Sequence, residues 1–404
     1  MLTVASLAAS PNALWPHYRA FRVAERLLLT GHSHQAWPDV ARFGLLAAFD
    51  DAAADVDHKW GRAFENAERV RAGFRALLDD DDGAIALTQN THDAVVRLLS
   101  ALPLRSRPRV VTTDGEFHSL DRQLRRLAEE GLEVVRVPAR PVVTLAERLA
   151  AVLRADPART SLVATSSVLF QTAEIVPHLP ELARACDDHG VPLLLDTYHH
   201  LGAVPFTLRG GLERAFVTGG GYKYLQLGEG NCFLRAPAEA ARALRPVVTG
   251  WFAAFGHLDA ARDGDARVPY DDGHARFAGS TYDPSSHYRA AAVLDFFDEQ
   301  RLTPALLREV SVHQTTRLRD GLAAAGLLGR AFDLAAPDPA RVAGFLALRT
   351  PAADVWSRHL ADRGVLTDSR GEILRLGPAP YLSDAQLDEA VGVIADVARE
   401  LAPT

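Results

Sequence analysis

Lys223 is the residue whose type is hardest to explain by charge alone. The chain has 44 lysines and arginines in total, and only Lys59 and Lys223 are lysines, so arginine serves almost everywhere that a plain positive charge is needed. A desolvated lysine amine can lose its proton and form a Schiff base, which arginine cannot do. The surrounding glycines permit close approach of the backbone to a ligand; they are Gly219, Gly220, Gly221, Gly228 and Gly230. We therefore predict a nucleophilic lysine rather than a surface lysine on a glycine-rich loop.

Other candidate groups follow apolar runs. Asp196 ends the run "VPLLLD", where a carboxylate needs a cationic or hydrogen-bonding partner, such as a protonated ring nitrogen. Thr91 and the amides after it could form a helix N-terminus that binds phosphate, or simply a helix cap. Phe117 and His118 could stack on a ring, or belong to a turn with a capping serine.

Metal and disulfide chemistry have weaker support. His32 and His34 would share one side of an extended strand, but no carboxylate or cysteine stands at ligand spacing. We expect them in a loop near the active site rather than at a metal. Cys186 and Cys232 are too few for a disulfide framework or a four-cysteine zinc site, which indicates a reducing cytoplasm.

The pattern of residues 84–217 predicts the fold that must position these groups. Short apolar runs alternate with longer segments of helical period, and Gly131 and Gly190 stand where such helices should end. The runs are "AIALT", "RVVTT", "EVVRV", "SLVATS", "PLLLDT" and "RAFVTG". This pattern indicates an α/β fold with a mostly parallel sheet sandwiched by helices. Ligands bind outside the carboxyl ends of the strands in such folds, where the candidates above would lie.

The domain organisation follows from where this pattern fades. We predict an N-terminal arm with part of a small domain in residues 1–50, a large α/β domain in 51–275, and a smaller C-terminal α+β domain in 276–404. The last contributes Arg375 on a strand, which by its type alone could be an ordinary surface arginine.

Composition excludes several function classes. A hydrophobic content of 48% with 24% charged residues is typical of a soluble globular protein. The formal net charge of −7 argues against a nucleic-acid binder. No apolar run approaches the roughly 20 residues that span a bilayer, and the N-terminus lacks the basic region of a signal peptide. We therefore expect a cytoplasmic protein without nucleic-acid or membrane partners.

Four segments resemble the fold type I pyridoxal-phosphate (PLP) enzymes of the class V aminotransferase group, most closely kynureninase. They follow one another along the chain in the same order as in that family. The first, "LLLDTYHHLGAVPF", is similar to the strand that ends in Asp-x-x-His-x-x-Gly, and "GGGYKYLQLGEG" resembles the Tyr-Lys-Tyr-Leu lysine loop. The segment "GWF" at 250–252 is similar to one with a cofactor-proximal tryptophan. Finally, "RGVLTDSRGEILRLGPAPYLS" resembles the kynureninase C-terminal segment.

The resemblance implies a role for each candidate residue. Lys223 would hold PLP as a Schiff base and later move protons, and Asp196 would keep the pyridinium nitrogen protonated, which makes the ring an electron sink. His199 would orient the cofactor, and Tyr222 would help to bind the phosphate and act as a general acid. The remaining implied roles are phosphate binding by Thr91 and the amide of His92, ring stacking by Phe117 with His118 as a substitute, phosphate contacts across a homodimer interface by Trp251, Ser280 and Thr281, and substrate carboxylate binding by Arg375.

Kynureninase-like hydrolysis of a Cβ–Cγ bond, as in kynurenine giving anthranilate and alanine, is the function that the resemblance implies. The segments "GHSHQAWP", "EFHS" and "AGSTYDP" depart from kynureninase, which bears on substrate identity rather than on cofactor chemistry. Transamination and β-elimination or another lyase reaction on a specialised-metabolite amino acid remain open. Cysteine desulfuration is disfavoured because no cysteine follows Cys232.

Two further alternatives have less support. A non-catalytic PLP-binding protein is disfavoured by the intact set of Lys223, Asp196 and Arg375. The segment "VTGGGYKY" could be a phosphate loop of a nucleotide-binding protein, but it matches neither Gly-x-Gly-x-x-Gly nor the P-loop pattern.

Overall fold

A seven-stranded sheet lies at the centre of the structure, a computed structural model that describes residues 2–258 and 267–401. The strand order is β2-β8-β7-β6-β5-β3-β4. The strands are β2 (Ala84–Thr88), β3 (Arg109–Thr113), β4 (Glu133–Val137), β5 (Thr160–Ser166), β6 (Leu193–Asp196), β7 (Phe216–Gly220) and β8 (Cys232–Ala236). All six apolar runs identified in the sequence form strands of this sheet.

The strand directions bring the candidate residues to one edge. Strands β4, β3, β5, β6 and β7 run parallel, whereas β8 runs antiparallel to both β7 and β2. Because two reversals restore the direction, β2 points the same way as β7. The carboxyl ends of six strands and the start of β8 therefore share one edge of the sheet.

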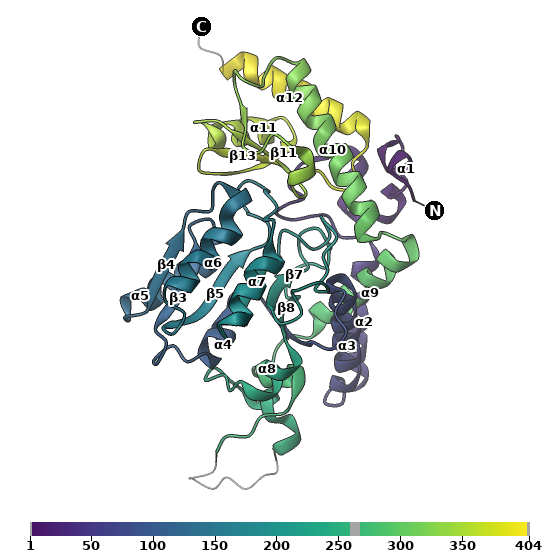
Figure 1. Ribbon diagram of the computed structural model, residues 1–404. Helices are drawn as coiled ribbons and strands as arrows, with labels where there is room; N and C mark the ends of the chain where they lie inside the picture. The colour runs from purple at the N-terminus through teal and green to yellow at the C-terminus, as the bar shows by residue number, and fades with distance from the viewer. Residues whose placement is uncertain (1, 259–266, 402–404) are drawn as a thin grey trace.

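Helices cover both faces of this sheet, as predicted (Figure 1). Alternate strand residues point to opposite faces: Val110 and Leu162 join one core cluster, and Val111 and Val163 join the other. The first cluster includes side chains of α4 (Thr91–Ala101) and α5 (His118–Glu129). The second includes side chains of α3 (Trp60–Leu78), α6 (Leu145–Ala155) and α7 (Leu179–Asp188). The mostly parallel, helix-sandwiched α/β fold is thus confirmed.

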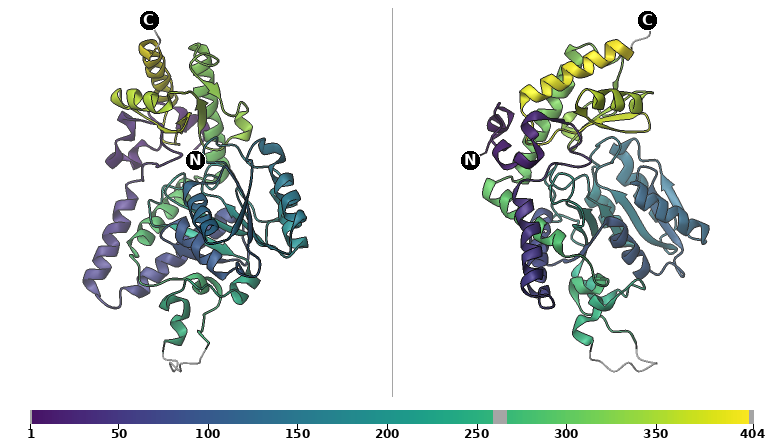
Figure 2. Two further views of the ribbon diagram at one scale, coloured as in Figure 1. Left: turned by 90° about the vertical axis from the view of Figure 1, so that its left-hand side faces the viewer. Right: turned by 180° about the vertical axis from the view of Figure 1, so that it is seen from behind.

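A second, smaller unit of sheet and helix lies at one end of the molecule (Figure 2). Its sheet has the order β12-β13-β10-β9 and is antiparallel. The strands are β9 (Asp333–Leu334), β10 (Leu346–Arg349), β12 (Asp368–Arg370) and β13 (Ile373–Leu376), and the helices are α10 (Pro304–Ala324), α11 (Ala353–Asp362) and α12 (Asp384–Leu401). Sequence patterning predicted this α+β arrangement.

The N-terminal segment joins this smaller unit. Strand β1 (Leu27–Leu28) pairs in parallel with β11 (Val365–Leu366), and Thr30 bridges to Gly377. Helix α2 (Val40–Ala54) instead packs with α3 against α9 (Ser285–Gln300), beside the large sheet. The domain limits given above stay a prediction. Within the described residues, no helix is both long enough and apolar enough to cross a membrane.

Candidate active site

Lys223 lies in the loop between β7 and β8 and reaches a cavity of about 310 Å³. Its side chain is buried, and Nζ lies 2.7 Å from Nε2 of His199. Burial lowers the pKa of the Lys223 amine to about 7, although Asp196 opposes this shift. A large fraction of the amine is therefore neutral near pH 7, which is the form that can attack a carbonyl carbon.

Asp196 ends β6 and forms part of the cavity wall. One carboxylate oxygen accepts a hydrogen bond of 2.9 Å from the backbone N–H of Tyr198. Burial raises the pKa of Asp196, while this hydrogen bond and Lys223 act in the opposite direction. A cationic group placed in the cavity would stabilise the ionised carboxylate further.

His199 is a neutral acceptor for the lysine amine. Burial, followed by the charges of Lys223 and Arg375, lowers its pKa well below the usual value. A neutral imidazole whose Nε2 accepts from Nζ carries its proton on Nδ1. This Nδ1 atom is buried and has no hydrogen-bond partner among the described residues.

The start of α4 forms one end of the cavity. Thr91 and His92 line the cavity, and the side chain of Asn90 caps the helix by accepting from the N–H of Asp93. The helix cap is thus Asn90, one residue before Thr91. Amides at the start of an eleven-residue helix can bind a phosphate group.

Phe117 lies in the cavity wall, together with Phe170, Tyr198 and Tyr222. The centroid of its ring lies 5.4 Å from Nζ of Lys223. His118 begins α5 and does not itself line the cavity, but its ring packs against Phe170, which does. The His118 ring lies 5.4 Å from the Phe117 ring, and its role as a substitute stacking residue stays a prediction.

Tyr222 lines the same cavity and carries a protonated phenol at neutral pH. Burial raises its pKa to about 12. Its ring stacks on His34, with centroids 4.9 Å apart and an interplanar angle of 17°. His34 thus lies next to the active-site cavity, as expected of the loop that contains it.

Trp251, Ser280 and Thr281 do not line the cavity that contains Lys223. The indole N–H of Trp251 donates to Oγ1 of Thr281 at 3.2 Å. Ser280 instead lines a second cavity of about 400 Å³ together with Phe252 and Tyr282. A contact of these three residues with a phosphate at α4 would therefore require a second copy of the chain.

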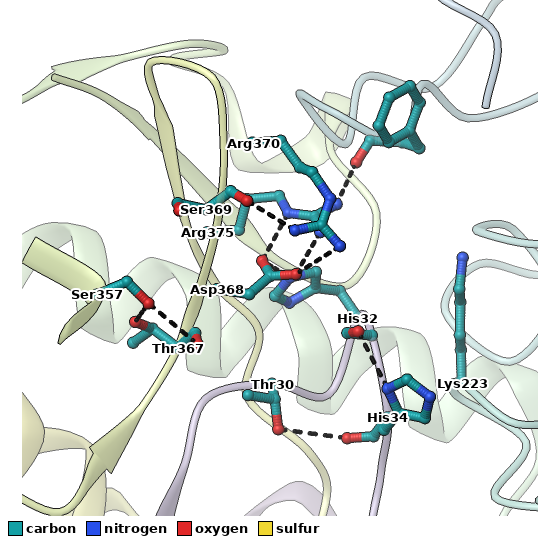
Figure 3. A network of polar contacts seen from close by, with 12 residues as sticks. Thr30, His32, His34, Lys223, Ser357, Thr367, Asp368, Ser369, Arg370 and Arg375 are labelled. Carbon is teal, nitrogen blue, oxygen red and sulfur yellow. Dashed lines mark hydrogen bonds and ion pairs between the residues drawn. The ribbon is translucent and has the colours of Figure 1, made fainter. Parts of the chain in front are cut away.

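Arg375 is buried on β13 and held by an ion pair and a carbonyl oxygen (Figure 3). Nε and Nη2 donate to the two carboxylate oxygens of Asp368, at 2.8 and 2.5 Å, and Nη1 donates to the carbonyl oxygen of Phe170 at 2.7 Å. It does not line the Lys223 cavity, although Phe170 does. Three of the five guanidinium N–H groups are used, which leaves one on each terminal nitrogen for a carboxylate.

His32 contacts the carboxylate of this ion pair. Its Nε2 is 2.7 Å from Oδ1 of Asp368, and burial lowers the pKa of His32 to about 4. Burial alone would raise the pKa of Asp368, but hydrogen bonds from His32 and Arg375 hold it well below its usual range. Asp368 is thus an anion that fixes the orientation of Arg375.

Two residues at or near the Lys223 cavity were not identified from the sequence, namely Glu116 and Tyr198. Glu116 is buried and accepts from the hydroxyls of Thr113 at 2.5 Å and of Ser166, which lines the cavity, at 2.7 Å. Burial raises the pKa of Glu116 to about 7. Tyr198 lies directly under the lysine amine. The position of Tyr198, two residues after Asp196, could have identified it as a residue near the site.

The donor set of the cavity fits PLP. The cavity contains the amine of Lys223, which is partly neutral near pH 7, and the buried carboxyl group of Asp196. It also contains the helix N-terminus at Thr91 and the aromatic ring of Phe117. Gly230 also lines the cavity, and a Cβ atom there would lie 2.9 Å from Ser286. The described residues contain no cluster of three or more His, Cys, Asp or Glu side chains that could hold a metal ion.

Comparisons with known proteins identify relatives and proteins of the same fold. Residues 307–394 match the kynureninase C-terminal domain. The uncharacterized aminotransferase YcbU of Bacillus subtilis (strain 168) is 25% identical over 337 residues, which is 83% of this chain and 85% of that protein.

Two solved structures show the same fold. The apo cysteine desulfurase of Thermococcus onnurineus NA1 has a TM-score of 0.79 at 16% identity and covers 97% of this chain and 98% of its own. A mutant of C-DES with glycine covalently linked to its PLP cofactor has a TM-score of 0.80 at 16% identity, covering 94% of this chain and 98% of its own. At this level of identity these matches show the fold alone. Together with the match to the kynureninase C-terminal domain and the aminotransferase relative, they confirm the resemblance found in the sequence to the PLP-dependent enzymes of the class V aminotransferase group of fold type I.

Proposed function

We propose that the chain hydrolyses the Cβ–Cγ bond of an amino acid with a γ-ketone, as in kynurenine giving anthranilate and alanine. The observation that carries this proposal is the kynureninase C-terminal domain in residues 307–394, which includes both Asp368 and Arg375. The Lys223 cavity of about 310 Å³ is within the size range of small-molecule sites, roughly 300–1,000 Å³.

The cofactor would be held by residues of the cavity wall. Lys223 would bind it covalently, Asp196 would pair with its ring nitrogen, and the amides of Thr91 and His92 would bind its phosphate group, with His199 orienting the assembly. Phe117 would stack on the ring. When bound, PLP supplies an electron sink for the bonds of the substrate α-carbon.

The protein's own groups would then move the protons. The neutral amine of Lys223 would take the α-proton, because burial keeps a large fraction of it unprotonated near pH 7. Tyr222 would donate a proton, since its raised pKa keeps the phenol protonated. Arg375 would bind the α-carboxylate through its two remaining N–H groups. Water would add to the γ-carbonyl, and the Cβ–Cγ bond would break to give a carboxylate and an amino acid.

Transamination is the second candidate, supported by the aminotransferase relative. Elimination or C–S bond cleavage would use the same lysine and carboxylate. Cysteine-based desulfuration has less support, because Cys186 and Cys232 are both buried and burial raises the pKa of each thiol to about 12. A thiol with such a pKa is a poor nucleophile at neutral pH. Intact active-site groups argue against a non-catalytic role.

We also propose that the chain forms a homodimer and is located in the cytoplasm. Trp251 and Phe255 are 42% and 48% exposed on η5 (Trp251–His257), and Phe49 on α2 is 71% exposed. The rings of Trp251 and Phe255 lie 5.4 Å apart, and contiguous exposed apolar side chains are typical of association surfaces. A second copy could place Trp251 beside the phosphate-binding end of the cavity. Domain limits at residues 50 and 275 belong to the same proposal.

Product analysis tests the proposed reaction. PLP-loaded protein would be incubated with L-kynurenine or its 3-hydroxy form, and the products separated by mass spectrometry. We expect anthranilate, or its hydroxy form, with alanine, and no product from a Lys223→Ala control. Release of pyruvate or ammonia would instead indicate elimination, and a keto acid would indicate transamination.

A further inference from the structure

Gln226 has a backbone conformation that its residue type disfavours. Its φ is +60°, in the left-handed region that favours glycine, and its side chain is fully buried. A residue with a Cβ atom keeps such a conformation only where the surrounding contacts hold it there. The contacts of Gln226 therefore act on the loop that carries Lys223, three residues earlier in the chain.

Gln226 closes the backbone turn that contains Lys223. Its N–H donates to the carbonyl oxygen of Lys223 at 3.2 Å, and the N–H of Leu227 donates to the carbonyl oxygen of Gly221 at 2.8 Å. These two hydrogen bonds close the loop on either side of the lysine. The point from which the Lys223 side chain extends into the cavity therefore depends on the backbone of Gln226.

The N-terminal segment holds both ends of the Gln226 amide. Its Oε1 accepts from the hydroxyl of Tyr18, and its Nε2 donates to Oε1 of Gln35 at 2.8 Å. Nε2 of Gln35 donates in turn to the carbonyl oxygen of Gly31 at 3.2 Å. Because a carbonyl oxygen can only accept, each amide in this chain of hydrogen bonds has one workable orientation. Donation therefore runs in one direction, from Tyr18 through Gln226 and Gln35 to Gly31.

Tyr18 is a donor whose position and charge are both fixed. It lies between η1 (Trp15–His17) and η2 (Arg19–Phe21), and its ring packs against Tyr381, with centroids 5.2 Å apart. Burial raises the pKa of Tyr18 well above the usual value. The phenol therefore keeps its proton at neutral pH and remains a donor to Gln226.

The other end of the chain of hydrogen bonds reaches the strand of Arg375. The N–H of Gly31 donates to the carbonyl oxygen of Gly377 at 2.7 Å, and Gly377 follows Arg375 by two residues. The amine and the carboxylate of an α-amino acid are attached to one carbon atom. A site that binds both groups needs a fixed distance between Lys223 and Arg375, because small misplacements of reacting groups are costly.

We infer that Gln226 is a positioning residue for Lys223, and that Tyr18 and Gln35 of the N-terminal segment hold it in place. This inference rests on the proposed function of Lys223. Gln226 does not line the Lys223 cavity, so it acts through the backbone turn rather than on a ligand. The N-terminal segment thereby contributes to the active site without reaching the cofactor.

Hydrogen exchange of the apoprotein tests this inference without the cofactor. Tyr18→Phe removes only a hydroxyl and leaves Oε1 of Gln226 buried without its donor. Peptides that cover residues 221–227 should exchange about tenfold faster, which corresponds to about 1.4 kcal/mol. The matched control is Tyr288→Phe, which removes the hydroxyl that another buried tyrosine donates to Asp51. Exchange in the same peptides should not change in this control.

The rate of cofactor attachment separates positioning from backbone strain. Gln226→Gly removes the side chain, but glycine suits the positive φ better than glutamine does. We expect this variant to attach PLP at least about threefold more slowly than wild type in stopped-flow absorption, with a weaker visible circular dichroism band. The matched control is Arg301→Gly, at an exposed residue whose φ is +55°, and it should attach PLP at the wild-type rate.

The outcomes distinguish this inference from the proposed function. Thermal unfolding of each apoprotein verifies folding, and the exchange result decides alone if the glycine variant does not fold. Exchange of Tyr18→Phe within twofold of wild type, or attachment of PLP by Gln226→Gly at the wild-type rate, would overturn the inference. Faster exchange in Tyr18→Phe together with a wild-type protein that binds no PLP would overturn the proposed function and support the hold of Tyr18 on the turn.

Discussion

Asp368→Asn is the substitution that most directly tests how Arg375 is held. The carboxylate of Asp368 accepts two hydrogen bonds from Arg375 and lies 2.7 Å from Nε2 of His32. An asparagine amide has one acceptor oxygen, so its NH₂ group must face a donor on Arg375 or on His32. The variant also leaves the buried Arg375 without its anion. Breaking a buried pair by removing one partner costs about 3–5 kcal/mol. Because Asp368 is slightly exposed, we expect about 2–4 kcal/mol of lost stability.

The measurement is urea unfolding of the apoproteins, with Asp354→Asn as the matched control. Asp354 pairs with Arg358 at 3.1 Å, but both side chains are exposed, so its loss should cost at most about 1 kcal/mol. Titration of the PLP-loaded variant with L-kynurenine, followed in the visible spectrum, should show weaker binding than wild type because Arg375 loses its fixed orientation. Equal stability of the two variants, together with unchanged L-kynurenine binding, would refute the role given to Asp368.

The remaining predictions concern Lys223 and the nearby Gly220, which ends β7. The amine of Lys223 has a pKa of about 7, compared with 10.5 for an ordinary lysine, so the rate of PLP attachment to apoprotein should rise with pH around a midpoint near 7. Because the unfolded chain keeps this proton up to about pH 10.5, Lys223 also makes the free energy of unfolding rise between pH 7 and 10.5. A midpoint above pH 9 in stopped-flow absorption would contradict the assigned pKa. Gly220→Ala should lower apoprotein stability by about 1–3 kcal/mol through overpacking against Tyr198 and Cys232. Gly392→Ala on α12, where a Cβ meets no atom within 4 Å, is its control, and equal melting temperatures for the two would count against the tight fit at Gly220.

The large sheet could be predicted because each parallel strand is buried on both faces and therefore appears as a continuous apolar run. Helix ends were also readable: Gly131 and Gly190 both have positive φ, shortly after α5 and α7 end. The pairing of β8 was not predicted. Its antiparallel position between β2 and β7 depends on long-range contacts that a short apolar run does not encode.

The site was predictable where a residue's type and its place at a strand end carried the information, as for Lys223 and Asp196. Contacts between distant segments were not. His32 and Asp368 are 336 positions apart in the chain. They meet because β1 pairs with β11 and the chain then continues into the small sheet. The phosphate contact proposed for Trp251 and Ser280 depends on a second copy, whose placement no single-chain pattern specifies.

The origin of the oxygen in the product tests the central claim most directly. PLP-loaded protein would act on L-kynurenine in water enriched in the heavy oxygen isotope, with Lys223→Ala as the control, and the products would be analysed by mass spectrometry. Hydrolysis at the γ-carbonyl predicts one heavy oxygen atom in the carboxylate of anthranilate and none of this product from the control. Formation of a keto acid without anthranilate, or anthranilate from the Lys223→Ala protein at the wild-type rate, would contradict the account.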